Sequence, residues 1–295
     1  MPRFSRRNFL KTGVATSALA GMAGSLPLFA EPATATDWVT LGKSNVKVTR
    51  LAFGTGTHNG AVQRQLGQDG FTRLVRHAYD RGIRFFETAA AYPQMHEMLG
   101  NALKGLPRDS YAFMSKVNTD SDTDPKMLID NLRTQAQTEY FDIMLLHVQH
   151  TPTWPTDSLP WQDAISEMQH RGAIRGHGAS VHSLPALALV PENQWLQIAM
   201  IRMNHKGAHM DGPDYHYHGL GDVDEVVNRV HQARAAGLGV ISMKLIGEGS
   251  FTDRSDRQQS VRFAFRHAGV QAVTIGYKST DEIDEAIENV NLALA

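Results

Sequence analysis

Apolar runs of strand length alternate with amphipathic stretches of helix length along most of the chain. In the stretch 71–82, Leu74, Val75 and Ala78 recur at helical spacing on one face, and Gly82 follows as a stop. The apolar runs carry few polar positions, as strands do when both faces of a parallel sheet are buried. Strands are predicted at 51–56, 83–89, 111–117, 141–147, 174–180, 196–204, 238–244 and 270–276. Helices are predicted at 71–82, 95–105, 125–137, 161–172, 184–190, 223–237, 257–269 and 280–294.

Each of the eight predicted strands is followed by a predicted helix. Eight such units in roughly 250 residues is the dimension of a (β/α)8 barrel. A doubly wound open sheet would alternate in a similar way, but no strand–turn–helix unit here carries the GxGxxG phosphate loop of that fold. We therefore predict an α/β protein with a single-domain (β/α)8 TIM barrel over residues 36–295.

The first 35 residues read as an export signal rather than as part of the barrel. Arg6 and Arg7 precede a weakly apolar run that is rich in Ala and Gly, and the arrangement resembles a twin-arginine signal. The glycines keep the run short and only mildly apolar, so no stable membrane span is expected. Cleavage is expected after Ala30 or Ala35, and the twin-arginine translocation machinery would then deliver the folded protein to the periplasm.

Composition narrows the function classes further. The formal net charge is -1, so nothing would attract nucleic acid or acidic lipid from a distance. The chain has no cysteine, which excludes disulfides, thiolate zinc sites and cysteine-ligated iron–sulfur clusters.

Ionisable residues stand where several predicted strands end. Glu87 ends the second strand, Lys116 the third and His147 the fourth, while Tyr92 lies in the loop after the second. The carboxyl ends of barrel strands face the active site, so these four side chains are expected to converge. A Lys ammonium lowers the pKa of a nearby phenol, and a carboxylate would hold that ammonium in place. Such a site suits protonation of a carbonyl oxygen while a cofactor supplies hydride, although a buried Lys–Glu pair can also be purely structural.

The order and spacing of these residues resemble the aldo-keto reductase superfamily across essentially all of the chain after the export segment. The matching segments are "LGKSNVKVTRLAFGTG", "RGIRFFETAAAY", "HEMLGNAL", "SKV", "FDIMLLH", "RGAIRGHGAS", "GLGVISMKLIGEG" and "FRHAGVQAVTIGYKSTDEIDEAIENV". By this resemblance Tyr92 is the proton donor, Lys116 the partner that lowers its pKa, and His147 the group that orients the substrate. Two positions depart from the pattern: Glu87 stands where the family has Asp, and Pro93 stands where a Gly usually follows the Tyr.

The resemblance also implies a cofactor, because members of the superfamily bind NADPH across the barrel mouth without a Rossmann unit. NADPH is therefore favoured, with NADH as the alternative. The residues implied for its site are Gly54, Thr55, Gly56, Ser180, Met243, Lys244, Gly276, Lys278 and Ser279. Val181 and Met200 stand where amides often hold the nicotinamide carboxamide. Asp284 falls where an Arg often meets the 2′-phosphate, and a carboxylate there would repel that group.

A long irregular insert follows the sixth predicted strand and is rich in histidine, at His205, His209, His216 and His218. Histidine is a common metal ligand, but no matched third ligand is evident, so no metal site is predicted. The insert is expected to cover the substrate, with Arg202 and Asn204 bracing it from the strand end.

The sequence thus predicts an exported oxidoreductase that reduces a small-molecule carbonyl substrate, an aldehyde or ketone, with hydride from a nicotinamide cofactor. Two alternatives remain open. One is a nucleotide-binding barrel that has lost hydride transfer and serves in sensing or interaction, which the departures at Glu87, Val181, Met200 and Asp284 would explain. The other is a metal-dependent barrel hydrolase that uses the histidine-rich insert.

Overall fold

The computed structural model describes residues 32–295. Residues 1–31 of the expected export segment, which include Arg6 and Arg7, lie outside this range. Within the described range, no helix combines the length and the apolar character that a membrane crossing requires.

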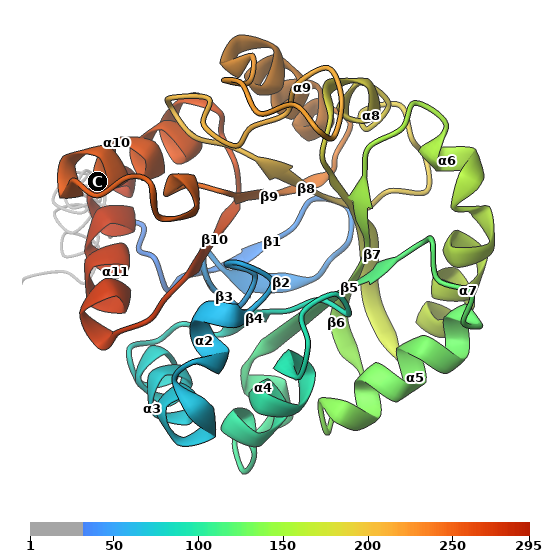
Figure 1. The fold of residues 1–295 in the computed structure, drawn as a ribbon, viewed down its shortest axis with the longest axis horizontal. Helices are drawn as coiled ribbons and strands as arrows, with labels where there is room; N and C mark the ends of the chain where they lie inside the picture. Colours follow the sequence, from blue (N-terminus) through green and yellow to red (C-terminus); the bar gives the residue numbers. More distant parts are fainter. Residues whose placement is uncertain (1–31) are drawn as a thin grey trace, which may run out of the picture. The chain divides into compact units, whose positions relative to one another are not determined.

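Eight parallel strands close into a barrel, in the order β10-β3-β4-β5-β6-β7-β8-β9 (Figure 1). Their bounds are β3 (Leu51–Gly54), β4 (Phe85–Glu87), β5 (Ala112–Asn118), β6 (Phe141–Gln149), β7 (Ile174–Val181), β8 (Ile198–Arg202), β9 (Gly239–Met243) and β10 (Ala272–Gly276). Closure comes from β10, which pairs with β3 with Val273 opposite Leu51. The prediction of a (β/α)8 barrel is confirmed.

The helices surround the barrel in the view of Figure 1 and pack on it through an apolar layer. They are α2 (Ala61–Arg64), α3 (Gly67–Asp80), α4 (Met95–Leu103), α5 (Pro125–Gln135), α6 (Trp154–Asp157), α7 (Leu159–His170), α8 (Leu184–Ala188), α9 (Val223–Ala235), α10 (Arg254–Arg262) and α11 (Thr280–Leu294). Their starts follow the sequence: at α5, Asp124 accepts a hydrogen bond from the Met127 amide and Pro125 occupies the first turn. The short helices α2 and α6 were not predicted.

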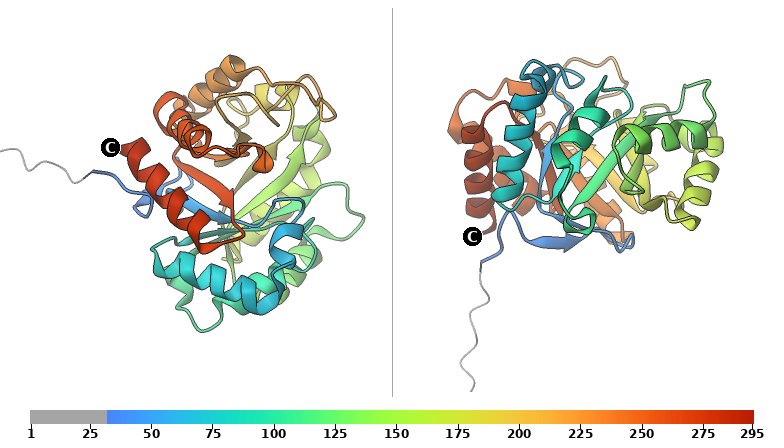
Figure 2. Two further views of the ribbon diagram at one scale, coloured as in Figure 1. Left: turned by 60° about the vertical axis from the view of Figure 1, so that its left-hand side comes forward. Right: turned by 90° about the horizontal axis from the view of Figure 1, so that it is seen from below.

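An antiparallel hairpin of β1 (Trp38–Thr40) and β2 (Lys47–Thr49) precedes the barrel. Leu41, Val46 and Val48 pack with side chains that fill the barrel interior, such as Phe85 and Ile143. The right panel of Figure 2 shows this hairpin at one end of the barrel. It closes the end where the strands begin, so the residues that follow the strands lie at the open end.

The chain joins this packing at Ala35. Ala35, the last residue of the expected export segment, is fully buried. Its amide donates to Asn291 Oδ1 at 2.8 Å, and its carbonyl accepts from the Leu51 amide at 3.0 Å. Residue 35 is therefore tied to both β3 and α11.

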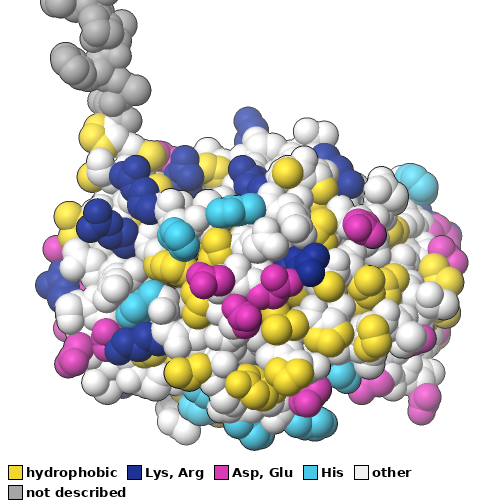
Figure 3. All heavy atoms as spheres, turned by 90° about the horizontal axis from the view of Figure 1, so that it is seen from above, with side chains coloured by type: hydrophobic (Ala, Val, Ile, Leu, Met, Phe, Trp, Pro, Cys, Tyr) yellow, Lys and Arg dark blue, Asp and Glu magenta, His cyan; other side chains and the backbone are white. Residues whose placement is uncertain are grey.

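On the face that Figure 3 shows, acidic, basic, histidine and apolar side chains are mixed. This mixture agrees with the near-neutral charge of the sequence.

Candidate active site

Glu87 and Lys116 form a buried ion pair at the open end of the barrel. Glu87 ends β4 and Lys116 lies on the neighbouring strand β5, with the Lys116 Nζ in direct contact with the Glu87 carboxylate. Lys116 Nζ also donates to the Thr88 carbonyl at 2.9 Å, and Thr274 Oγ1 donates to Glu87 Oε2 at 3.3 Å. The extra methylene of Glu, compared with Asp, therefore leaves the pairing with Lys116 intact.

Tyr92 lies over this pair, in the loop that leads from β4 to α4. Lys116 Nζ is 5.1 Å from the centre of the Tyr92 ring. The ring of His147, from β6, meets Tyr92 edge to face with 5.6 Å between centroids. Gly56 makes room for the phenol, because a Cβ at Gly56 would lie 2.7 Å from the Tyr92 oxygen. The structure thus brings together all four residues predicted from the strand ends, and Pro93 does not turn the phenol away from them.

The pKa of Tyr92 differs from the sequence prediction. Burial, followed by the negative charge of Glu248, raises the pKa of the phenol above its usual value. The prediction that Lys116 lowers this pKa is wrong for this structure, because the Lys116 charge is matched by Glu87 and lies beneath the ring rather than at the hydroxyl. Burial, with the nearby charge of Lys244, lowers the pKa of Lys116 itself. The phenol therefore stays protonated and can act as a hydrogen-bond and proton donor.

His147 is held neutral. Burial, together with the charges of Lys116 and Lys244, lowers its pKa well below the ordinary histidine value. Its Nδ1 lies 3.2 Å from Oδ1 of Asn118, which sits opposite it on β5. The next residue, Val148, has a φ of 56°, which is a strained conformation for a β-branched side chain. This kink aims the Val148 amide at Ser180 Oγ, at 3.1 Å.

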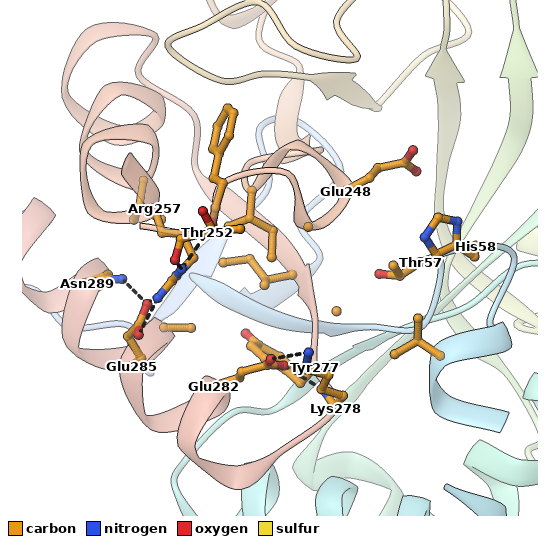
Figure 4. Close-up of a pocket in the computed structure, with 18 residues that line it drawn as sticks. Thr57, His58, Glu248, Thr252, Arg257, Tyr277, Lys278, Glu282, Glu285 and Asn289 are labelled. Atoms are coloured by element: carbon orange, nitrogen blue, oxygen red, sulfur yellow. Dashed lines mark hydrogen bonds and ion pairs between the residues drawn. The ribbon is translucent and has the colours of Figure 1, made fainter. Parts of the chain in front are cut away.

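Two adjacent cavities run from this cluster toward α11. The first, called the tetrad cavity, measures about 80 Å³ and is lined by Gly54, Gly56, Thr57, Glu87, Tyr92, Met200, Met243, Lys244, Leu245, Ile246, Glu248, Thr274, Ile275 and Gly276. The second, called the α11 pocket, measures about 470 Å³ and is lined by Thr57, His58, Val62, Ile246, Glu248, Gly249, Phe251, Thr252, Arg257, Val261, Ile275, Gly276, Tyr277, Lys278, Glu282, Glu285, Ala286 and Asn289 (Figure 4). Five residues line both, so the two spaces are neighbours.

The predicted cofactor residues divide into two groups. Gly54, Gly56, Met243, Lys244, Gly276 and Lys278 line one or both cavities. The other three support the walls instead: Thr55 Oγ1 donates to the Glu87 carbonyl at 2.9 Å, Ser180 holds the Val148 amide, and Ser279 caps α11 by accepting from the Glu282 amide at 3.3 Å.

Asp284 does not lie where the sequence analysis expected it, at the 2′-phosphate of the cofactor. Asp284 does not line the α11 pocket: its carboxylate pairs with His77 at 2.9 Å and with Arg81 at 3.0 Å, toward α3. Glu282 and Glu285 line the pocket in its place. Sequence reasoning missed both, although they and Asn289 recur at helical spacing along one face of α11.

The histidine-rich insert is braced as predicted. Arg202 Nε donates to Asp211 Oδ1 at 2.7 Å, and Asn204 Nδ2 donates to the Ala208 carbonyl at 2.6 Å. Tyr215 from this insert packs against His150 with 4.9 Å between ring centroids. Residues 32–295 contain no group of three or more His, Asp or Glu side chains placed to hold a metal ion.

Comparisons with known proteins agree with this geometry. The sequence model of the Aldo/keto reductase family matches residues 50–264. A Glycine max protein named Probable aldo-keto reductase 1 is 31% identical over 148 residues, which cover 44% of this chain and 40% of that protein. The match thus spans about two fifths of that relative's length.

Solved structures share the fold. A Pseudomonas aeruginosa protein assigned to the aldo-keto reductases superimposes with a TM-score of 0.71 at 18% identity, covering 89% of this chain and 97% of the other. The holo form of a Bacillus halodurans aldo-keto reductase gives 0.66 at 20% identity, covering 86% and 91%. A Klebsiella pneumoniae aldo-keto reductase in complex with NADPH gives 0.64 at 20% identity, covering 88% and 91%.

Proposed function

Because the chain belongs to the aldo/keto reductase family, we propose that it is an oxidoreductase that reduces an aldehyde or ketone with hydride from a nicotinamide cofactor. The observation that carries this proposal is the convergence of Tyr92, His147 and the Lys116–Glu87 pair beside the tetrad cavity. Because a protonated phenol and a neutral imidazole lie next to each other, they suit a substrate oxygen on which negative charge develops.

The cavities fit an elongated nucleotide. They lead from Tyr92 to α11, where the α11 pocket offers about 470 Å³. Two of its buried polar atoms, Asn289 Oδ1 and Tyr277 Oη, have no hydrogen-bond partner among the described residues. Buried polar atoms are usually satisfied, so a polar ligand in this pocket would supply what they lack. Gly54, Gly56 and Gly276 would flank the reacting end, where a side chain on any of them would collide with its neighbours.

Tyr92 is the proton donor in this proposal. When bound, the nicotinamide supplies hydride to the carbonyl carbon. Tyr92 transfers its phenolic proton to the carbonyl oxygen as that oxygen gains negative charge. The raised pKa of Tyr92 keeps the proton on the phenol until a stronger base, the developing alkoxide, is next to it.

The other three residues, Glu87, Lys116 and His147, position Tyr92 and the substrate oxygen. Glu87 fixes Lys116 beneath the Tyr92 ring, and this buried pair holds the ring in place beside the tetrad cavity. His147 donates a hydrogen bond from Nε2 to the same oxygen. Since a neutral imidazole carries one proton, this role requires the Asn118 amide to turn its NH2 group toward Nδ1.

Replacement of Tyr92 by Phe tests the proposal. The variant should lose carbonyl reduction by at least about 100-fold, because a general acid of this kind contributes that much, while nucleotide binding is retained. Tyr140→Phe is the matched control, since Tyr140 packs against Arg108 and Arg175 near the start of β6. Turnover of Tyr92→Phe at the rate of the Tyr140→Phe control would refute the assigned role. Binding of nucleotide without turnover by the natural chain, over a broad carbonyl panel, would favour the sensing alternative.

We also propose that the protein is exported in its folded state to the periplasm through the twin-arginine machinery. Arg6 and Arg7 in the leader support this proposal. Free nicotinamide cofactor is scarce in that compartment, so the cofactor would be loaded before export. The paired change Arg6→Lys and Arg7→Lys should retain the protein in the cytoplasm, as followed by cell fractionation. Denatured periplasmic protein should release a nucleotide, and its absence would contradict the loading step.

A further inference from the structure

Three carboxylates line the α11 pocket. Glu282 and Glu285 line it from α11, and Glu248 lines it from the loop after β9. Figure 4 shows Glu282 and Glu285 together on one side and Glu248 across from them. Two cationic side chains line the same pocket, Arg257 and Lys278. Glu248 is paired with Lys244, so the carboxylates that remain for a ligand at the α11 end are Glu282 and Glu285.

Both cations are already engaged. Arg257 makes two contacts with the Glu285 carboxylate, from Nε at 2.7 Å and from Nη2 at 2.9 Å. Its Nη1 bonds the carbonyls of Phe251 at 3.0 Å and Thr252 at 2.6 Å. Four of the five N–H groups of the guanidinium are therefore used within the chain, and one Nη2 hydrogen remains.

The start of α11 is occupied in the same way. Glu282 Oε2 accepts from the Lys278 amide at 2.8 Å, and the Lys278 Nζ lies 3.8 Å from the same carboxylate. Helix starts and lysines commonly attract phosphate, but here both face a carboxylate of the chain itself. A phosphate at this helix start would lie beside the Glu282 carboxylate.

The position of the reacting end decides which part of a dinucleotide meets these carboxylates. The proposed function places the nicotinamide end beside Tyr92, so the adenosine end extends toward α11. In NADP(H) the adenosine ribose carries a 2′-phosphate, and in NAD(H) it carries a 2′-hydroxyl. A carboxylate accepts a hydrogen bond from the hydroxyl but repels the phosphate, which is the same logic by which an acidic residue selects NAD in other nucleotide-binding folds.

We propose that this chain binds NAD(H) in preference to NADP(H), and that Glu282 and Glu285 determine this preference. The inference rests on the proposed function for the orientation of the nucleotide. It runs against the preference for NADPH that the family resemblance implies.

Equilibrium binding tests this inference without any turnover. Isothermal titration of the purified full chain with NADH, NADPH, adenosine 5′-monophosphate and adenosine 2′,5′-bisphosphate would compare each 2′-hydroxyl compound with its 2′-phosphate counterpart. We expect the 2′-hydroxyl compound to bind about tenfold more tightly in both pairs, because one unfavourable contact between a phosphate and a carboxylate is worth about that much.

Three variants assign the effect to residues. Glu282→Gln keeps an oxygen for the Lys278 amide but removes the charge, and Glu285→Gln frees Arg257 for a phosphate. Each should reduce the discrimination severalfold by strengthening the binding of the 2′-phosphate compounds. Glu288→Gln is the control: Glu288 lies on the same helix, is exposed, and pairs with Arg254 instead of lining the pocket.

The outcomes separate this inference from the proposed function. Equal or tighter binding of NADPH by the natural chain, or variants at 282 and 285 that behave like Glu288→Gln, would overturn the inference while carbonyl reduction could persist. Preferred binding of NADH without any reduction of carbonyl compounds would support the inference and refute the proposed function. Failure of every nucleotide to bind would overturn both.

Discussion

The two ends of the proposed cofactor site hold the same kind of ion pair in different surroundings. At the reaction end, the side chains of Lys116 and Glu87 are 1% and 4% exposed. At the α11 end, those of Arg257 and Glu285 are 25% and 24% exposed. A buried charge that loses its partner cannot be rescued by water, whereas a partly exposed one can. The reaction end is therefore fixed, and the α11 end can change its ligand preference at little cost to folding.

The largest expected effect compares the two pairs directly. Lys116→Met should reduce the free energy of unfolding by about 3–5 kcal/mol, because it leaves the Glu87 carboxylate buried without a partner. Arg257→Met should reduce it by only about 1 kcal/mol, since Glu285 remains in contact with solvent. Denaturant unfolding measures both. The double change Lys116→Met and Glu87→Leu should recover part of the first loss, and equal losses for the two single variants would contradict the comparison.

The second largest expected effect is a loss of folding stability in acid, through His96. Burial lowers the pKa of His96, on α4 behind the Tyr92 loop, to about 4. The unfolded chain binds this proton more readily, so the contribution of His96 to stability is complete above about pH 6.5 and is lost as the pH drops toward 4, by about 3 kcal/mol. Unfolding measured at several pH values tests this sign. His96→Gln cannot titrate and should show a shallower dependence, and an unchanged slope would contradict the assignment.

Asn118 offers a smaller and more specific effect at the reaction end. Asn118→Asp should fix the proton on Nδ1 of His147, leave Nε2 without one, and slow reduction by about 10- to 100-fold. Asn118→Ala removes the contact without imposing that tautomer and should cost less. Steady-state rates of the two variants decide the matter, and equal losses would argue against a role in setting the tautomer.

The smallest effect concerns Glu248, which contributes to both cavities. Its charge raises the pKa of Tyr92, and reduction requires the protonated phenol. Glu248→Gln should therefore move the alkaline loss of activity to lower pH, by about one unit or less. Glu225→Gln, on the outer helix α9, is the control for a change of net charge. A shift to higher pH would show that the carboxylate acts in another way.

The reaction end was predictable because strands impose a simple rule. The carboxyl ends of parallel barrel strands share one rim, so Glu87, Lys116 and His147 could be placed together from the positions of three apolar runs. The pKa of Tyr92 was not predictable in the same way. Sequence names the neighbouring charges but does not give the depth of burial, and burial is the larger influence here.

The α11 end shows why the side-chain positions of helices and loops are harder to predict from sequence. Neighbouring helix positions are about 100° apart, so Asp284 and Glu282 point to nearly opposite sides of α11. The carboxylate of Asp284 therefore lies on the α3 side, and the carboxylate of Glu282 lines the pocket. The contribution of Glu248 to both cavities was not predicted, because Glu248 lies after β9 at a φ of 52°, a conformation that no sequence pattern predicts.

The barrel is closed by its last strand against its first, and Ala35 is anchored by Asn291 near the end of the last helix. A nascent chain therefore cannot complete this structure before β10 and α11 have left the ribosome. The proposed twin-arginine route exports only folded proteins. An incomplete translation product would lack β10, could not close the barrel, and would therefore remain in the cytoplasm.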